Sequence, residues 1–182
     1  MGNNPASRVY VNSKRKACEE CGFYSEEYAL PEETKQKALV ELVETLTVRA
    51  DIDGILVQLP LPKGIDEEAV LTAISPSKDV DGFHPMNMGA LPIGKEGFVP
   101  CTPAGIMKIL SAYDIDPLGK QCVVIGRSNI VGKPMALLLL QKNGTVTVCH
   151  SKTQDLAEVC RRADILVAAV GKLGIVTADM IK

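Results

Sequence analysis

The stretch CVVIGRSNIVGKPMALLLL, from Cys122 to Leu140, decides the fold of the second half of the chain. Its first residues are mostly β-branched and apolar, which is typical of a buried parallel strand. Gly126 lets the backbone turn sharply after the strand, and the apolar run after Pro134 predicts a helix. Such a turn directs free N–H groups and the positive end of the helix dipole toward an anion. We therefore predict a phosphate-binding turn.

Two phosphate-binding motifs compete for this turn. In a P-loop the two glycines are five residues apart and are followed by Lys and then by Ser or Thr. Here Gly126 and Gly132 are six apart, and Pro134 stands where the magnesium-binding hydroxyl would be. A dinucleotide-binding turn has three glycines, and Ser128 takes the place of the second one. The sequence argues against NTPase chemistry and matches the dinucleotide motif in part.

The segments that follow complete a βαβαβ alternation. Residues 145–149 (TVTVC) and 165–169 (ILVAA) are predicted to be strands, and residues 153–163 between them a helix. This alternation predicts a parallel sheet with right-handed crossovers and a ligand bound at the carboxyl ends of the strands.

The residues after the second strand bear on the choice of cofactor. An NAD site usually has Asp or Glu there, and the carboxylate binds the ribose 2′-hydroxyl. This chain has His150, Ser151 and Lys152 instead, together with Arg127 in the first turn. Cations and hydroxyls suit a 2′-phosphate, so the sequence favours NADP over NAD. The alternative is that Arg127 and Lys152 are ordinary solvated cations.

Composition favours a cytoplasmic protein that binds small molecules. Of 182 residues, 46% are hydrophobic, and 20 basic and 22 acidic residues give a net charge of −2. No basic patch predicts a nucleic-acid partner, and no apolar run approaches the roughly 18 residues of a membrane span. The six cysteines are expected to be reduced. Cys18 and Cys21 lack a second ligand pair for zinc, so no metal is predicted, and they are better explained as neighbours on a helix.

The first half also combines helices with a strand. Residues 54–59 are predicted to be a strand, and Pro60 and Pro62 prevent further pairing beyond it. Three segments have helical periodicity or helix-start signals: residues 7–21, 38–50 and 66–74.

An irregular connection rich in Gly and Pro, residues 75–103, is expected to lead to a helix at residues 103–113. The predicted fold class is α/β, with two α/β domains, the second a Rossmann-like, doubly wound parallel sheet. We place the boundary near residue 100, which gives domains at residues 1–100 and 101–182.

Four polar residues of the first half are candidate site residues. Tyr10 and Lys14 are four apart on an expected helix, so the phenol and the ammonium share a face. Short-chain dehydrogenases use such a pair after the nucleotide motif, whereas here it precedes Gly126 by more than 110 residues. Gln58 ends the expected strand, and Asp81 precedes a glycine in a loop. Taken singly, these residues also fit a solvated helix face, an edge hydrogen bond and a turn.

Six motifs, in this order, resemble those of the methylenetetrahydrofolate dehydrogenase/cyclohydrolase family: YVNSK, GILVQLPLP, KDVDGFHPMNMG, PCTPAG, VVIGRSNIVGKP and TVTVCHSKT. The resemblance covers essentially the whole chain. It implies NADP-dependent oxidation of 5,10-methylenetetrahydrofolate to 5,10-methenyltetrahydrofolate and hydrolysis of that product to 10-formyltetrahydrofolate, in one-carbon metabolism and purine biosynthesis. It also implies tetrahydrofolate derivatives as partners, a folate cleft between two domains and a homodimer.

The resemblance assigns roles on the folate side. It implies that Lys14 is the catalytic lysine and that Tyr10 packs against the bound folate. Gln58 would contact and tune Lys14, and Asp81 would anchor the pterin. The implied substrate-binding residues are Tyr10, Lys14, Val57, Gln58, Leu59 and Asp81.

On the nucleotide side, the resemblance implies a loop formed by Gly126, Arg127 and Ser128, with Arg127 and Ser151 at the 2′-phosphate. Members of the family usually have further segments at both ends, so we expect a chain trimmed at both termini. The alternative function is then a non-catalytic NADP-binding fragment of that enzyme. Dehydrogenases of the shikimate type lack the YVNSK and VQLPLP motifs at these positions.

Overall fold

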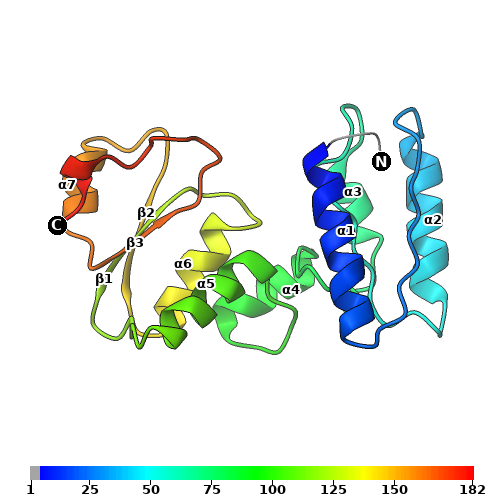
Figure 1. Cartoon of the computed structure of the whole chain (residues 1–182), viewed down its shortest axis with the longest axis horizontal. Coiled ribbons are helices and arrows are strands. Elements are labelled where there is room, and N and C mark those ends of the chain that lie inside the picture. Colours follow the sequence, from blue (N-terminus) through cyan, green and yellow to red (C-terminus); the bar gives the residue numbers. More distant parts are fainter. Residues whose placement is uncertain (1–4) are drawn as a thin grey trace. The chain divides into compact units, whose positions relative to one another are not determined.

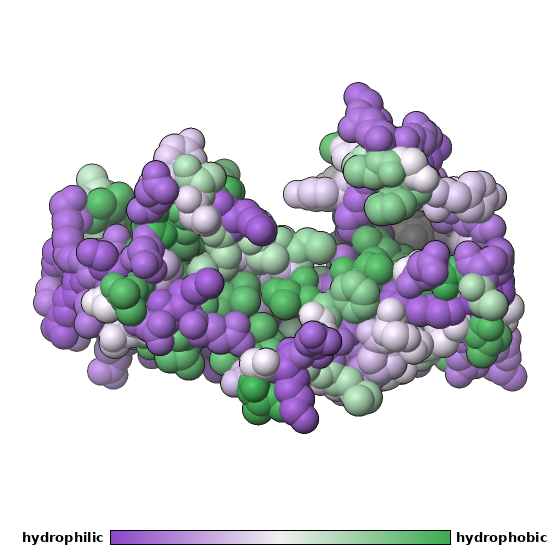
Figure 2. All heavy atoms as spheres, turned by 90° about the horizontal axis from the view of Figure 1, so that it is seen from below, coloured by the Kyte–Doolittle hydropathy of each residue, from purple (hydrophilic) through white to green (hydrophobic). Residues whose placement is uncertain are grey.

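The computed structural model describes residues 5–182, and the chain divides into two units, Met1–Asp79 and Val80–Lys182. Each unit has buried apolar clusters of its own. Among the described residues, no helix has both the length and the apolar composition needed to cross a membrane. On the face drawn in Figure 2, hydrophilic residues are spread widely, in keeping with the interspersed charges of the sequence.

The described part of the first unit contains three α-helices. They are α1 (Pro5–Glu20), α2 (Gln36–Val48) and α3 (Glu67–Thr72), close to the predicted positions. Asp66 fixes the start of α3, because its carboxylate accepts hydrogen bonds from the N–H groups of Glu68 and Ala69 at 3.0 and 3.2 Å. The buried core of the unit is formed by Leu39, Val43, Ile55, Val70 and Ile74.

The strand predicted at residues 54–59 is wrong in its extent. Ile55 forms a single parallel bridge with Asp79, and the Ile55 N–H donates to the carbonyl of Lys78 at 2.7 Å. Within the described residues the bridge does not extend into a ladder. A strand needs a continuous partner, and Pro60 and Pro62 have no N–H to offer one. The described first unit is therefore mainly helical, and the extended sheet lies in the second unit.

The sheet of the second unit confirms the predicted parallel alternation. Its strands β1 (Gln121–Ile125), β2 (Thr145–Cys149) and β3 (Ile165–Ala168) are parallel in the order β2-β1-β3. Helix α6 (Gly132–Gln141) joins β1 to β2, and α7 (Leu156–Arg161) joins β2 to β3. In Figure 1, α5 (Cys101–Ala112) and α6 lie on one side of the sheet and α7 on the other.

Strand β1 is buried on both faces because side chains alternate along it. Cys122 and Val124 pack with Met135 and Leu139 of α6. On the opposite face the cluster is formed by Val123, Ile125, Cys149, Cys160 and Ala163. This two-sided burial explains the continuous apolar run that identified the strand.

The connection before the sheet belongs to the second unit and is partly helical. It contains α4 (Pro85–Ala90) and a 3-10 turn η1 (Leu91–Ile93), where an irregular segment was expected; a second 3-10 turn, η2 (Ala178–Met180), lies near the C-terminus. Leu91 is buried, and the Gln141 side chain of α6 donates to its carbonyl at 2.5 Å. The division at Asp79 therefore precedes the boundary expected near residue 100, because this segment packs on α6.

Candidate functional site

Lys14 and Gln58 meet in the first unit although 44 residues separate them. The Lys14 Nζ donates a hydrogen bond to Gln58 Oε1 at 3.3 Å, and both side chains are half-buried. Gln58 Nε2 donates to the carbonyl of Leu59 at 2.9 Å. The second bond fixes which end of the amide faces Lys14, so the ammonium meets an oxygen acceptor.

The other predicted folate-side residues lie at different places in the chain. Tyr10 is 62% exposed and lies one turn before Lys14 on α1, so its ring is accessible beside the ammonium. Val57 and Leu59 flank Gln58 and are half-buried. Asp81 belongs to the second unit, and its role in the site stays a prediction.

Lys78, a residue that sequence reasoning missed, links the Gln58 segment to the end of α2. Its Nζ donates to the carbonyls of Thr47 and Arg49 at 2.8 and 2.7 Å. These carbonyls lie at the negative end of the α2 dipole, where a cation is stabilising. The Lys78 carbonyl accepts from the N–H of Ile55, three residues before Gln58. The segment that carries Gln58 is thus tied to α2.

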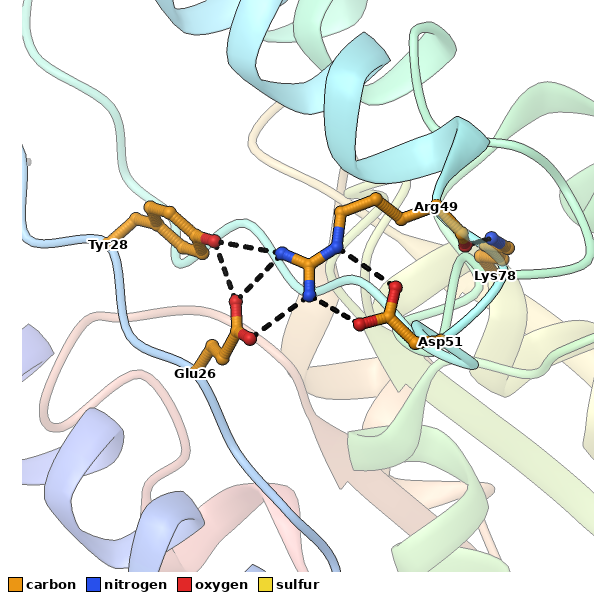
Figure 3. A network of polar contacts seen from close by, with 5 residues as sticks. All are labelled: Glu26, Tyr28, Arg49, Asp51 and Lys78. Carbon is orange, nitrogen blue, oxygen red and sulfur yellow. Dashed lines mark hydrogen bonds and ion pairs between the residues drawn. The ribbon is translucent and has the colours of Figure 1, made fainter.

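Arg49 ties the segment after α1 to the same end of α2 (Figure 3). Its guanidinium donates two hydrogen bonds to Glu26, at 3.0 and 3.1 Å, and two to Asp51, at 3.0 and 2.6 Å. Tyr28 donates to Glu26 at 2.6 Å. The hydrogen bonds from Arg49 lower the pKa of Asp51 to about 2 and also lower the pKa of Glu26. Arg49 and Lys78 thus tie the segment after α1 and the segment that carries Gln58 to the C-terminal end of α2.

The predicted nucleotide turn follows β1 in the second unit. Gly126 has a φ of 127°, and a Cβ there would overlap the carbonyl oxygen of Ala169. A Cβ on Gly132 would lie 2.8 Å from the Arg127 nitrogen and 2.5 Å from the Gly126 carbonyl carbon. Both glycines are therefore required by close backbone approach, which is the arrangement that brings backbone N–H groups near a phosphate.

Ser128 has a structural task in this turn. Its Oγ accepts hydrogen bonds from the N–H groups of Val131 and Gly132, at 3.2 and 3.3 Å, at the start of α6. This explains why a serine can stand in the place of the second glycine: it closes the turn with its side chain. Arg127 is exposed, and in residues 5–182 its guanidinium has no hydrogen bond or ion pair.

Ser151 lies exposed in a turn that follows β2. The His150 N–H donates to Thr153 Oγ1 at 2.8 Å, and the Thr153 N–H donates back to the His150 carbonyl at 2.9 Å. The Lys152 N–H donates to His150 Nδ1 at 3.1 Å. Sequence reasoning gave Thr153 no role, although a threonine four residues after the last residue of a strand is a signal for such a side-chain turn.

The thiols and acidic groups give no metal centre in the part of the chain that the structure describes. There, no three His, Cys, Asp or Glu side chains are placed to share an ion, and Cys18 and Cys21 are free thiols. Burial raises the pKa of the Cys122, Cys149 and Cys160 thiols, so these cysteines behave as small apolar side chains.

Comparison with known families identifies both halves of the chain. Residues 1–81 match the catalytic domain of tetrahydrofolate dehydrogenase/cyclohydrolase, and residues 100–182 match the NAD(P)-binding domain of the same family. The chain belongs to the tetrahydrofolate dehydrogenase/cyclohydrolase family. The predicted resemblance and the Rossmann-like fold of the second unit are confirmed.

Relatives named bifunctional protein FolD match this family member over its whole length. The protein from Acetivibrio thermocellus is 63% identical over 182 residues, and the one from Ruminiclostridium cellulolyticum is 58% identical. In both comparisons all of this chain aligns with 64% of the relative. The chain therefore spans about 64% of the length of these curated relatives.

Solved structures of the family have the same fold. The bifunctional FolD enzyme of Campylobacter jejuni is 53% identical, with a TM-score of 0.96 over all of this chain and 64% of its own. The methylenetetrahydrofolate dehydrogenase-cyclohydrolase of Trypanosoma brucei, in complex with NADP and an inhibitor, is 41% identical, with a TM-score of 0.95 over all of this chain and 62% of its own.

Proposed function

We propose that this chain carries both activities named for its relatives, with 5,10-methylenetetrahydrofolate as the first substrate. The first activity is oxidation to 5,10-methenyltetrahydrofolate with NADP, and the second is hydrolysis of that product to 10-formyltetrahydrofolate. The observation that carries the proposal is the hydrogen bond between Lys14 and Gln58, within the residues that match the catalytic domain. An amine held beside a neutral amide is suited to proton transfer in the hydrolysis, and in its neutral form it does not oppose the cation formed in the oxidation.

Lys14 is the proposed acid and base. Loss of a hydride from the methylene carbon leaves the 5,10-methenyl cation, which a neutral amine tolerates better than an ammonium. Gln58 Oε1 orients the Lys14 Nζ without adding a formal charge that would hold it protonated. In the hydrolysis, water adds to the methenyl carbon, Lys14 takes a proton from that water, and a proton is returned to the ring nitrogen as the carbon–nitrogen bond breaks.

The remaining folate-side residues bind and orient the substrate in this proposal. The exposed ring of Tyr10 offers a face on which a pterin or aminobenzoyl group can stack. Asp81 would accept hydrogen bonds from the pterin amino and ring N–H groups. Val57 and Leu59 present apolar and backbone surface beside Gln58. We propose these residues as the substrate-binding set.

The second unit is proposed to hold NADP, whose nicotinamide accepts the hydride in the oxidation. Gly126 and Gly132 let the turn pack tightly, since a Cβ at either position would meet backbone atoms of the same unit. The N–H groups of this turn would bind the pyrophosphate. Arg127 and Ser151 would bind the 2′-phosphate, and Ser128 would hold the turn in shape. These donors fit a phosphate better than a bare ribose hydroxyl.

A second candidate is nucleotide binding without turnover. It is favoured by one observation, that the chain aligns with 64% of its curated relatives. Purified chain supplied with 5,10-methylenetetrahydrofolate separates the two candidates. We expect NADPH to form faster than NADH, and 10-formyltetrahydrofolate to accumulate when 5,10-methenyltetrahydrofolate is supplied. NADP binding with neither reaction would favour the second candidate.

We also propose a cytoplasmic homodimer that serves one-carbon metabolism and purine biosynthesis. The support for the cytoplasmic location is that all six cysteines are free thiols, three of them buried. Sedimentation of the purified chain tests the oligomeric state, with a mass of twice 19.5 kDa expected.

A further inference from the structure

The turn that follows β2 is closed by its own side chains. Thr153 Oγ1 accepts from the His150 N–H at 2.8 Å, and the backbones of the same two residues are joined by a second hydrogen bond of 2.9 Å. The turn begins directly after Cys149, the last residue of β2, whose side chain has no exposed surface. The turn thus continues from the buried end of the strand.

His150 adds a further restraint to this turn. Its Nδ1 accepts a hydrogen bond from the Lys152 N–H at 3.1 Å. An accepting Nδ1 carries no proton, so in the neutral ring the proton lies on Nε2. The imidazole therefore holds the backbone of Lys152, the residue that follows Ser151.

Only some of the hydrogen-bond donors of residues 150–153 are available to a ligand. The N–H groups of His150, Lys152 and Thr153 are all taken within the turn. In the described structure, the N–H and hydroxyl of Ser151 and the ammonium of Lys152 have no partner, and both side chains are exposed. One amide, one hydroxyl and one ammonium on adjacent residues form a donor set that suits a phosphate monoester.

We propose that Thr153 and His150 are positioning residues that hold the turn in the shape required for a 2′-phosphate, and so set the preference for NADP over NAD. The inference rests on the proposed use of NADP. It adds two residues that need not touch the cofactor and that act through Ser151 and Lys152.

The physical basis is preorganisation. Without the Thr153 hydroxyl, the His150 N–H loses its acceptor and the turn becomes free to move. A mobile turn must be ordered when the phosphate binds, and this lowers affinity for phosphate-bearing ligands alone. One lost hydrogen bond of this kind corresponds to a loss of about 10-fold in affinity.

Calorimetry on the full chain tests the proposal with two pairs of probes: NADP against NAD, and adenosine 2′,5′-bisphosphate against adenosine 5′-monophosphate. For Thr153→Val we expect Kd to rise about 10-fold for the two probes with a 2′-phosphate and to stay within about twofold for the others. Thr153→Ser keeps the hydroxyl and should bind as the original chain does. Thr147→Val, the same change at an exposed position of β2, is the matched control.

Selectivity distinguishes positioning from a general structural effect. Equal losses for all four probes, or unchanged affinity in Thr153→Val, would overturn the proposal. If Thr153→Val does not fold, His150→Phe takes its place, because it removes the Nδ1 acceptor and leaves the Thr153 contacts; it must show the same selective loss. An original chain that binds NADP no better than NAD would instead overturn the proposed cofactor, and the positioning role with it.

Discussion

The Lys14 Nζ lies 3.3 Å from Gln58 Oε1, and the same amide is held from its other end by the carbonyl of Leu59 at 2.9 Å. Gln58 is therefore an oriented partner rather than a passive neighbour. Because an amide has no charge, it can hold the amine in place in either protonation state.

Replacing Gln58 by Glu tests this neutrality. A carboxylate at the same position would favour the charged form of Lys14, so the turnover of the oxidation should fall by about 10- to 100-fold at neutral pH. The pH at which turnover reaches half its maximum should move upward. Gln58→Asn, which keeps a neutral amide on a shorter side chain, is the control and should leave that pH unchanged. The same midpoint in Gln58→Glu would contradict the role.

Replacing Arg127 by Ala tests how the 2′-phosphate is bound. The loss of a charge-assisted hydrogen bond of about 1.5 to 3 kcal/mol should weaken NADP binding by roughly 10- to 100-fold. NAD binding should hardly change. Arg162→Ala removes an exposed arginine that is bonded to Glu158 on α7, so it is the matched control. Equal losses for NADP and NAD in Arg127→Ala would show that the guanidinium does not contact the 2′-phosphate.

Two glycines of the second unit should respond to alanine in opposite ways. At Gly132 a Cβ would meet the backbone of Gly126 and Arg127, so Gly132→Ala should lower the free energy of unfolding by about 3 kcal/mol. At Gly105, within α5, the added Cβ would meet no heavy atom within 4 Å apart from its chain neighbours and the backbone of its own helix, and Gly105→Ala should stabilise the chain by about 0.5 to 1 kcal/mol. Denaturant unfolding measures both. A Gly132→Ala variant as stable as the original chain would contradict the close approach.

The hydrogen bonds that join Arg49 to Glu26 and Asp51 should make the free energy of unfolding depend on pH in the acid range. Its hydrogen bonds lower the pKa of Asp51 to about 2 and lower that of Glu26, so the native state holds these carboxylates charged more firmly than the unfolded state does. The stabilisation is fully present above the unfolded pKa values of about 4 and is lost as pH falls through the native values.

Chemical unfolding of the original chain and of Arg49→Met between pH 6 and pH 2 measures this effect. We expect the stability difference between them to shrink as the pH falls below about 4. Arg15→Met, which removes an exposed i,i+4 pair with Glu19 at 3.9 Å, is the control and should show a smaller difference throughout. A difference for Arg49→Met that is independent of pH would contradict the network.

The parts of the fold that the sequence predicted are those with a strong local signal. β1 was recognisable because burial on both faces demands an unbroken apolar run. A full strand was predicted around Ile55, where the structure has a single bridge. Strand pairing depends on a partner distant in sequence, here Asp79, and the periodicity of a segment does not reveal that partner. Helix α4 was missed because it has only six residues, and its start depends on Pro85 and on His84 Nδ1 as the cap.

The site was predictable only as a list of residues. The resemblance proposed that Gln58 contacts Lys14, but the orientation of the amide depends on the Leu59 carbonyl, which no motif encodes. The supporting bonds of Lys78 join its side chain to backbone atoms 31 and 29 residues back, so they emerge only from the folded structure. The Thr153 bond is local, and its position after a strand was a signal in the sequence that was not used.

The central claim is that Lys14 performs the proton transfers in the first unit while the second unit binds the cofactor. Lys14→Met tests it most directly, through the rate of 5,10-methenyltetrahydrofolate hydrolysis and the Kd for NADP measured on the same preparation. We expect the hydrolysis to fall at least about 100-fold, with the NADP Kd within about twofold of the original. Hydrolysis at the original rate in Lys14→Met would contradict the account.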